Sequence, residues 1–293
     1  MKALIFTLPS IYILSSCVPV AQTAPPTPSS NTPILVKPNH PNPVNASNIT
    51  LSVADKKKIG LKIWQNESNG TIKGLTTWNV GEEFPSIGIG HFIWYPAGVR
   101  GPFTESFPQF VKYAQQRKVK VPTWLVNAQG KVNPSPWKSR KQFNAEFNEA
   151  KLTELRHFLS SQVNLQTDFI ILKSQAALGK ILSSSTPSET TIIRANYQKV
   201  ATTSNGMYAL IDYVNFKGEG INPKEAYKGH GWGLKQVLLG MQASRSGQPA
   251  AHAFAESAKR ALNTRIANSD AKRGEQRWRA GWHNRCDTYK KPL

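Results

Sequence analysis

The chain has few cysteines and few acidic residues. Cysteine occurs twice in 293 residues, at Cys17 and Cys286, which excludes a disulfide framework and a zinc site built on paired cysteines. Only 17 residues are Asp or Glu, against 37 Lys and Arg, so the formal net charge is +20. This charge favours a polyanionic partner, such as nucleic acid, anionic lipid or an acidic cell-wall polymer, without choosing among them.

Motifs for several chemistries are also missing. The chain has no His-Glu-x-x-His sequence, and its glycine-dense segment 229–233 has neither the Gly-Lys-Ser/Thr end of a phosphate loop nor a dinucleotide fingerprint. We therefore expect no metal and no cofactor. Strand and helix patterns do not alternate and no internal repeat occurs, which disfavours a doubly wound parallel sheet.

The first 17 residues have the layout of a secretory signal: Lys2, a mostly apolar run over 3–14, and small residues before Cys17. The apolar run is shorter than the ~20 residues that a membrane-spanning helix needs. Leu14-Ser-Ser-Cys17 resembles the lipobox of bacterial lipoproteins, which implies export and a lipid on Cys17. Because Val18 rather than Asp follows, it also implies an outer-membrane anchor facing the periplasm. The alternative is a secretory signal with an incidental cysteine.

Residues 18–51 are rich in Pro, Ser, Thr and Asn and poor in apolar residues, which predicts a disordered linker. A flexible chain of this length has an r.m.s. reach of roughly 30–35 Å, so a tethered domain could search a layer near the membrane. The whole chain is 39% hydrophobic and 10% aromatic, enough for a sizeable core. We expect residues 52–293 to form one folded domain.

The folded part opens with a predicted helix that starts at the N-cap Ser52 and ends at Asn69-Gly70. Ile59, Ile63 and Glu67 are spaced four apart and share one face. Glu67 therefore occupies the next position of an apolar stripe, where a leucine would be expected if the helix only packed.

A β-hairpin follows, with arms over 75–79 and 84–91 joined by a turn at 80–83. The remaining patterns are helical, which predicts an α+β fold: a mostly helical body with a small hairpin subdomain. The expected helices cover residues 106–117, 139–159, 168–182, 190–200, 207–216, 233–243, 249–266 and 270–282.

An acid on an apolar stripe before a glycine-bearing hairpin suits the cleavage of a glycosidic bond. That reaction needs a proton for the leaving oxygen, and partial burial raises the pKa of a carboxyl group so that it keeps one. Trp64 and Trp78 could provide such a setting for Glu67. Gly88 and Gly90 would allow a sugar chain to approach the backbone.

Ser86-Ile-Gly-Ile-Gly-His91, nineteen residues after Glu67, resembles the Thr-Ile-Gly-Ile/Tyr-Gly-His segment of phage-type lysozymes. Segment 272–278 resembles the basic closing helix of that family, and segment 78–95 is similar to bacterial lysozyme-like proteins. The resemblance implies a lysozyme-like fold, with Glu67 as general acid and Ser86 in the position of the threonine that helps to place water. It makes His91 a structural residue of the hairpin.

The chain departs from the family at the second carboxylate, where Val80 stands. Glu82 is our preferred substitute, as a catalytic residue, while Glu83 and Asn79 of the same turn are expected to contact substrate. If neither glutamate reaches the cleft, the single-acid mechanism of lytic transglycosylases remains, which closes muramic acid into an anhydro ring. Hydrolysis and transglycosylation both stay open.

Further substrate contacts are expected from Trp78 and from Asn215 or Glu219, which follow an apolar helix. The expected function is cleavage of the β-1,4 bond between N-acetylmuramic acid and N-acetylglucosamine, with peptidoglycan strands and the membrane as partners and no nucleic acid. The alternatives are a noncatalytic peptidoglycan-binding lipoprotein of the same fold and a secreted lytic toxin. The basic residues are expected to form a solvated surface.

Overall fold

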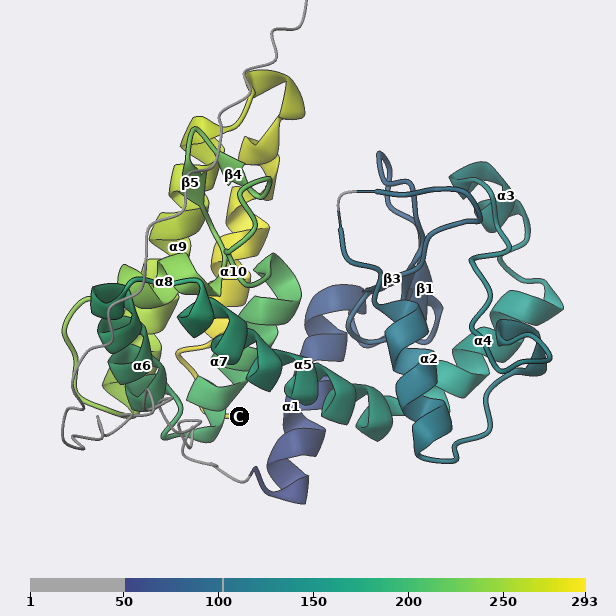
Figure 1. Cartoon of the computed structure of the whole chain (residues 1–293), viewed down its shortest axis with the longest axis horizontal. Helices are drawn as coiled ribbons and strands as arrows, with labels where there is room; N and C mark the ends of the chain where they lie inside the picture. Colours follow the sequence, from purple (N-terminus) through teal and green to yellow (C-terminus); the bar gives the residue numbers. More distant parts are fainter. Residues whose placement is uncertain (1–50, 102) are drawn as a thin grey trace, which may run out of the picture. The chain divides into compact units, whose positions relative to one another are not determined.

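The computed structural model describes residues 51–101 and 103–293. The predicted signal segment 1–17, with its lipidation site Cys17, lies outside the described residues, as does the predicted linker up to residue 50. Leu51, the last residue assigned to the linker, is buried in the core. The described part is mostly helical with a small antiparallel sheet, which confirms the α+β class (Figure 1).

The strands occur in two places, between the first two helices and before the eighth, and helices make up most of the rest. The α-helices are α1 (Val53–Ser68), α2 (Phe107–Gln116), α3 (Arg140–Ala145), α4 (Ala150–Ser161), α5 (Val163–Ser183), α6 (Pro187–Val200), α7 (Ser204–Lys217), α8 (Leu234–Leu239), α9 (Gln248–Asn268) and α10 (Arg279–Thr288). The strands are β1 (Thr76–Thr77), β2 (Ser86–Ile87), β3 (Phe92–Ile93), β4 (Ala226–Tyr227) and β5 (His230–Gly231).

Helix α1 has the predicted ends. The Ser52 hydroxyl caps its first turn by accepting a hydrogen bond from the backbone N–H of Asp55 at 3.0 Å. Asn69 ends it in the left-handed region, with φ of 54°. Ile59 and Ile63 are fully buried, so the face that Glu67 shares points into the protein.

The sheet has three antiparallel strands, whereas the sequence predicts a two-stranded hairpin. Thr76 pairs with Ile87 and Ile87 pairs with Phe92. The predicted arm 84–91 stops at Ile87 because positive φ angles at Gly88 (78°) and His91 (47°) turn the chain back into β3. His91 therefore lies in a tight turn between β2 and β3.

Helix α5 is the central helix and contacts α1, α2, α4, α6 and α7 (Figure 1). Its buried Gln166 accepts a hydrogen bond from the Ile89 N–H at 2.9 Å and donates one to the Leu159 carbonyl at 2.7 Å. This polar side chain interrupts the apolar pattern, which is why the predicted start at residue 168 is five residues late. Gly88 allows the approach, because a Cβ there would lie 2.2 Å from the Gln166 Oε1.

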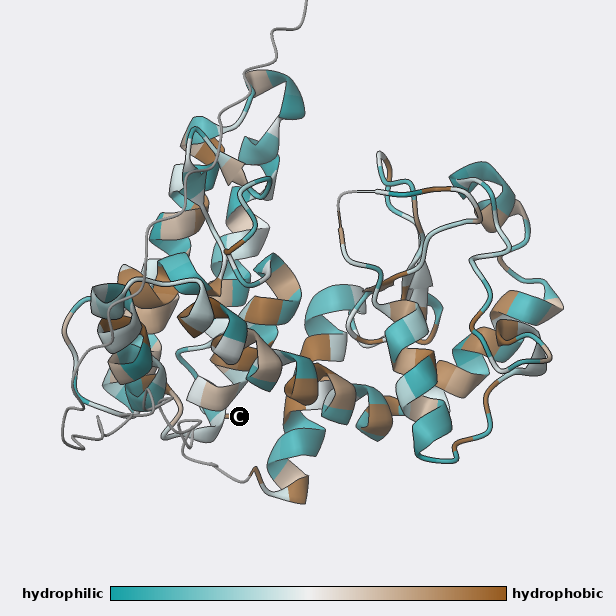
Figure 2. Ribbon diagram, in the orientation of Figure 1, coloured by the Kyte–Doolittle hydropathy of each residue, from teal (hydrophilic) through white to brown (hydrophobic). Residues whose placement is uncertain are grey.

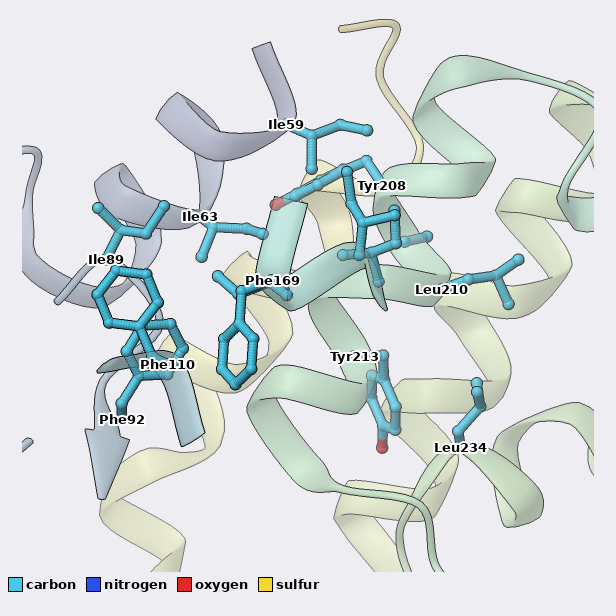
Figure 3. Close-up of a cluster of buried hydrophobic side chains, with 14 of the residues drawn as sticks. Ile59, Ile63, Ile89, Phe92, Phe110, Phe169, Tyr208, Leu210, Tyr213 and Leu234 are labelled. Carbon is cyan, nitrogen blue, oxygen red and sulfur yellow. The ribbon is translucent and has the colours of Figure 1, made fainter. Parts of the chain in front are cut away.

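The core is continuous across α5. Phe169 lies between the aromatic side chains of the sheet region and those of α7 (Figure 3), and its ring centroid is 5.4 Å from that of Phe92 and 5.8 Å from that of Phe110. Apolar and hydrophilic residues alternate along single helices (Figure 2), as expected of helices that bury one face.

Two of the predicted helices are each divided in the structure. The pattern over 139–159 gives two helices, α3 and α4, because the chain turns at Glu146, whose carboxylate accepts hydrogen bonds from Trp137 and Gln142. The pattern over 270–282 gives two short 3-10 turns, Ala271–Arg273 and Glu275–Trp278, and then α10. Gly274 stands between the turns with φ of 59°, which interrupts a continuous helix.

The predicted helix over 233–243 ends early, at Leu239. The glycine-dense segment before it forms the second half of a hairpin, in which β4 and β5 are joined by a turn at Lys228 and Gly229 with positive φ at both residues. None of the described helices is both long and apolar enough to span a bilayer.

Glycine is required where α6 meets α7, and not in the middle of α5. A Cβ on Gly206 would lie 1.8 Å from the Val200 carbonyl oxygen, whereas a Cβ on Gly179 would meet nothing within 4 Å. We expect Gly206→Ala to lower the free energy of unfolding by about 1–3 kcal/mol. Gly179→Ala should raise it by about 0.5–1 kcal/mol. Urea denaturation measures both, and a shift of the same sign in the two variants would contradict the packing described here.

Candidate active site

Glu67 lies at the last turn of α1 with its side chain 14% exposed. Its Oε1 accepts hydrogen bonds from Arg285 Nη2 at 2.7 Å and Asn215 Nδ2 at 3.1 Å. Its Oε2 lies 3.4 Å from His91 Nδ1. The structure thus brings together three predicted residues, Glu67, His91 and Asn215, from α1, the β2–β3 turn and α7.

Arg285 is the centre of a buried ion network. Its Nε and Nη2 each donate to Asp212 at 2.8 Å, and the Tyr289 hydroxyl also donates to Asp212 at 2.6 Å. Asp212 is fully buried and Arg285 is 9% exposed. Because a buried cation requires a partner, Asp212 holds Arg285 in place and Arg285 in turn fixes Glu67.

The network continues to the neighbour of Glu67. Asn66 donates to the Tyr208 hydroxyl at 2.6 Å, and that hydroxyl shares a hydrogen bond with Thr288 at 2.8 Å. Helices α1, α7 and α10 are therefore joined by polar contacts as well as by packing.

The pKa of Glu67 departs from the prediction. Burial raises it, but the guanidinium of Arg285 and the imidazole of His91 lower it by more, so the pKa lies below its usual value. The prediction of a raised pKa was wrong because it included burial but not the charge of Arg285 beside the carboxyl group. Trp64 donates from Nε1 to the Thr71 carbonyl at 3.1 Å.

His91 is more than a structural residue, because it contacts Glu67 directly. Burial lowers the pKa of His91 by more than the charge of Glu67 raises it. Its Nε2 is buried and has no hydrogen-bond partner among the described residues. The positive φ that turns the chain also points this ring at Glu67.

The other predicted catalytic residues form a second group in the β1–β2 turn. Asn79 donates to Glu82 Oε2 at 3.1 Å, and Trp78 Nε1 donates to the Glu82 carbonyl at 2.8 Å. Burial raises the pKa of Glu82 by more than its hydrogen bonds with Asn79 and Ser86 lower it. No hydrogen bond or ion pair between described residues links this group to Glu67. Val80 is 84% exposed.

The structure gives packing roles to Trp78 and Gly90, whereas Glu83 stays accessible. Trp78 is 6% exposed and packs edge-on against Phe143 at 5.8 Å, so its ring belongs to the core and not to a sugar site. Glu83 is exposed on the turn. A Cβ on Gly90 would lie 2.9 Å from Ile170 and 3.0 Å from Asn215 Oδ1, so this glycine lets the turn pack against α5 and α7.

A cavity of about 140 Å³ borders this site. Two of the neighbours of Glu67, His91 and Asn215, line it together with Gly90, Ser106 and Lys173. The other residue proposed at the end of α7, Glu219, forms an ion pair with Lys180 at 2.7 Å and does not line this cavity.

The charge of Lys217 also contributes to the lowered pKa of Glu67. Its Nζ lies 3.9 Å from the ring centroid of Phe216 and 3.8 Å from that of Trp282. Burial lowers the pKa of Lys217 well below its ordinary value, and the charges of Arg265 and Arg285 lower it further.

A second ion cluster surrounds Glu275. Glu275, which is 5% exposed, accepts hydrogen bonds from Arg265 at 2.8 Å and from the Tyr227 hydroxyl at 2.7 Å. Burial raises its pKa, but hydrogen bonds from Arg265 and Tyr227 lower it to about 2 overall. Glu275 thereby ties the β4–β5 hairpin to α9.

Sequence reasoning missed Asp212, Lys217 and Arg285. Asp212 is a lone acid within the apolar run of α7, and that isolation is the signal for a buried charge that needs a partner. Arg285 stands among closing basic residues that the sequence assigns to a solvated surface, an assignment that is wrong for this side chain.

Cys286 is fully buried and has no disulfide. Burial and the charge of Asp212 raise the pKa of its thiol to about 12, so the thiol is unreactive at neutral pH. Among residues 51–101 and 103–293, no three His, Cys, Asp or Glu side chains are grouped to hold a metal ion.

Comparison of the chain with protein-family models, with curated proteins and with solved structures gives no match.

The network predicts a strong and specific effect of removing the Asp212 charge. Asp212→Asn leaves Arg285 buried with only Glu67 as a counter-ion, so we expect the free energy of unfolding to fall by about 3 kcal/mol. The matched control is Asp168→Asn, because Asp168 pairs with Lys56 at 2.9 Å with both side chains about 40% exposed, and such pairs contribute about 0–1 kcal/mol. Equal losses in urea denaturation would contradict the central place of Asp212.

Proposed function

We propose that this chain is a peptidoglycan glycosidase of lysozyme-like fold that cleaves the β-1,4 bond between N-acetylmuramic acid and N-acetylglucosamine. The observation that carries the proposal is the Glu67 carboxyl, 14% exposed, which faces the glycine-bearing β2–β3 turn and is held by neighbours that line a cavity. The likeness of Ser86-Ile-Gly-Ile-Gly-His91 to phage-type lysozymes supports it.

Glu67 is the proposed proton donor to the leaving oxygen. Because its pKa is lowered, Glu67 is a carboxylate in the free protein near neutral pH, so it must take up a proton when substrate binds before it can donate one. After the transfer, Arg285 and Asn215 are in place to stabilise the carboxylate. The His91 ring lies against the other carboxyl oxygen, with Nδ1 3.4 Å from Oε2.

The second step is proposed to use either water or the sugar itself. Glu82 belongs to the separate group with Asn79 and Ser86, so Glu67 is the acid on which both routes depend. Attack by water gives reducing ends, and ring closure within muramic acid gives anhydro ends. We propose a lipid on Cys17 as the anchor that keeps the domain near the wall on the periplasmic side of the outer membrane.

One observation favours a second function, a noncatalytic peptidoglycan-binding lipoprotein. Arg285 compensates the charge of Glu67 at 2.7 Å, and a carboxylate held in this way is also what a binding protein without turnover would contain. Pull-down with purified peptidoglycan without release of fragments would support this function.

The proposal predicts that Glu67→Gln loses activity while it remains folded. Loss of a general acid should lower the release of soluble fragments from purified sacculi by roughly 100- to 10,000-fold. The matched control is Glu149→Gln, because Glu149 is exposed and its side chain caps no backbone N–H. Mass spectrometry of the fragments separates anhydro from reducing ends. Undiminished release by the folded Glu67→Gln variant would reject the proposal.

The lowered pKa of Glu67 predicts the pH dependence of the reaction. Only the protonated carboxyl group can donate, and its fraction grows as pH falls toward a pKa that Arg285 and His91 hold below the usual value. We therefore expect kcat/KM to rise as pH falls from 7 to 5, measured by fragment release from sacculi. A rate that rises with pH over this range would assign Glu67 to a base and contradict its role as acid.

A further inference from the structure

The two oxygens of the Glu67 carboxyl group have unequal surroundings. Oε1 accepts hydrogen bonds from Arg285 Nη2 at 2.7 Å and from Asn215 Nδ2 at 3.1 Å. Oε2 accepts no hydrogen bond from the described residues, and His91 Nδ1 lies 3.4 Å from it. Because a carboxylate oxygen has two lone pairs, both lone pairs of Oε1 are occupied while those of Oε2 are open.

This difference decides where the carboxyl group takes up a proton. A proton on Oε1 would have to displace one of two N–H donors, and both are held in place: Arg285 by Asp212, and Asn215 by its position within α7. A proton on Oε2 displaces nothing. The proton therefore forms its O–H bond at Oε2, and the same bond breaks when the proton passes to the leaving oxygen.

His91 reaches Oε2 from a backbone conformation that is unfavourable for histidine. Its φ of 47° lies in the left-handed region, which glycine and asparagine adopt more readily. Residues held in such conformations cluster at functional sites, where the surrounding structure fixes them. Here the strained residue is the one whose ring nitrogen lies beside the open oxygen of Glu67.

The Nδ1 atom of His91 is suited to donate to Oε2. A carboxylate charge 3.4 Å away favours a hydrogen rather than a lone pair on this nitrogen. The contact is longer than a good N–H···O hydrogen bond, and such contacts in a site without substrate often tighten when substrate binds. A donor in this position stabilises the charge that Oε2 gains as its proton leaves.

We propose that Glu67 carries and donates its proton at Oε2, and that His91 is the positioning residue of this oxygen, donating to it from Nδ1 once the proton has left. This inference rests on the proposed function, because only that reaction gives the proton a destination. Arg285 and Asn215 hold Oε1 throughout, whereas His91 acts on the oxygen that reacts.

Two substitutions of His91 separate its N–H donor from the rest of the side chain. Asparagine and glycine both accept a positive φ, and asparagine keeps a nitrogen bonded to Cγ, as Nδ1 is in histidine. We expect His91→Gly to lower kcat about 10- to 100-fold with KM within about twofold of wild type, as for a lost hydrogen bond to a charged group. His91→Asn should keep kcat within about fivefold of wild type.

Steady-state kinetics on soluble, uncross-linked glycan strands measure both constants. The matched control is Lys118→Gly, because Lys118 is exposed, lies outside the site and also has a positive φ, of 58°. This variant makes the same backbone change and should leave kcat unchanged.

The pH profile distinguishes a donor at Oε2 from a merely structural side chain. The charged groups that act on Glu67 are Arg285 from α10, His91 from the β2–β3 turn and Lys217 from α7, and those that act on His91 are Glu67 and Arg285. Loss of a donor to the carboxylate raises the pKa of Glu67. The fall in kcat/KM with rising pH should therefore move to higher pH in His91→Gly, and less so in His91→Asn.

Nitrogen-15 NMR of the wild-type protein tests the contact without a substitution. The shifts of the two ring nitrogens show which of them carries hydrogen. We expect a hydrogen on His91 Nδ1 while Glu67 is a carboxylate, and a change in the Nδ1 shift as Glu67 titrates. A lone pair on Nδ1 in that state would overturn the proposal, even if neither His91 variant folds.

The kinetic outcomes are distinct. Undiminished kcat in folded His91→Gly, or equal losses in the glycine and asparagine variants, would overturn the role of His91 and leave Glu67 standing as the acid. A wild-type protein that releases no fragments from sacculi would reject the glycosidase, and the inference about Oε2 with it.

Discussion

Arg285 is a buried cation that two carboxylates share, and the arrangement of the site depends on this sharing. Asp212 takes two of its N–H groups and Glu67 takes one, all at 2.7–2.8 Å. In a low-dielectric interior a cation without such partners would cost several kcal/mol. The requirement fixes α1, α7 and α10 relative to one another and sets the orientation of Glu67.

The same interaction sets the charge of the site. Arg285, together with His91, lowers the pKa of Glu67 below its usual value. In the free protein the Glu67 side chain is therefore a carboxylate, and a proton bound to it would be released easily. A glycosidase therefore has to load this carboxyl group with a proton when substrate binds, whereas a binding protein does not.

The sequence predicts the local parts of this site because their signals are local. The ends of α1 and the burial of its Ile59 and Ile63 face follow from caps and periodicity. The start of α5 was missed because Gln166 is polar for a tertiary reason: its amide holds the Ile89 N–H of the sheet. The pattern of apolar residues along the chain cannot reveal this contact, because Ile89 is 77 residues away from Gln166 in the sequence.

The sequence by itself determined the α+β class and the helix that presents Glu67. Only the tertiary structure decided that the predicted arm 84–91 turns at Gly88 and His91 and that Glu67 meets Arg285, 218 positions later. Caps and periodicity act within a few residues, whereas the partner of a buried charge is chosen by how whole helices pack. The pKa of Glu67, which the sequence predicts in the wrong direction, is a property of that packing.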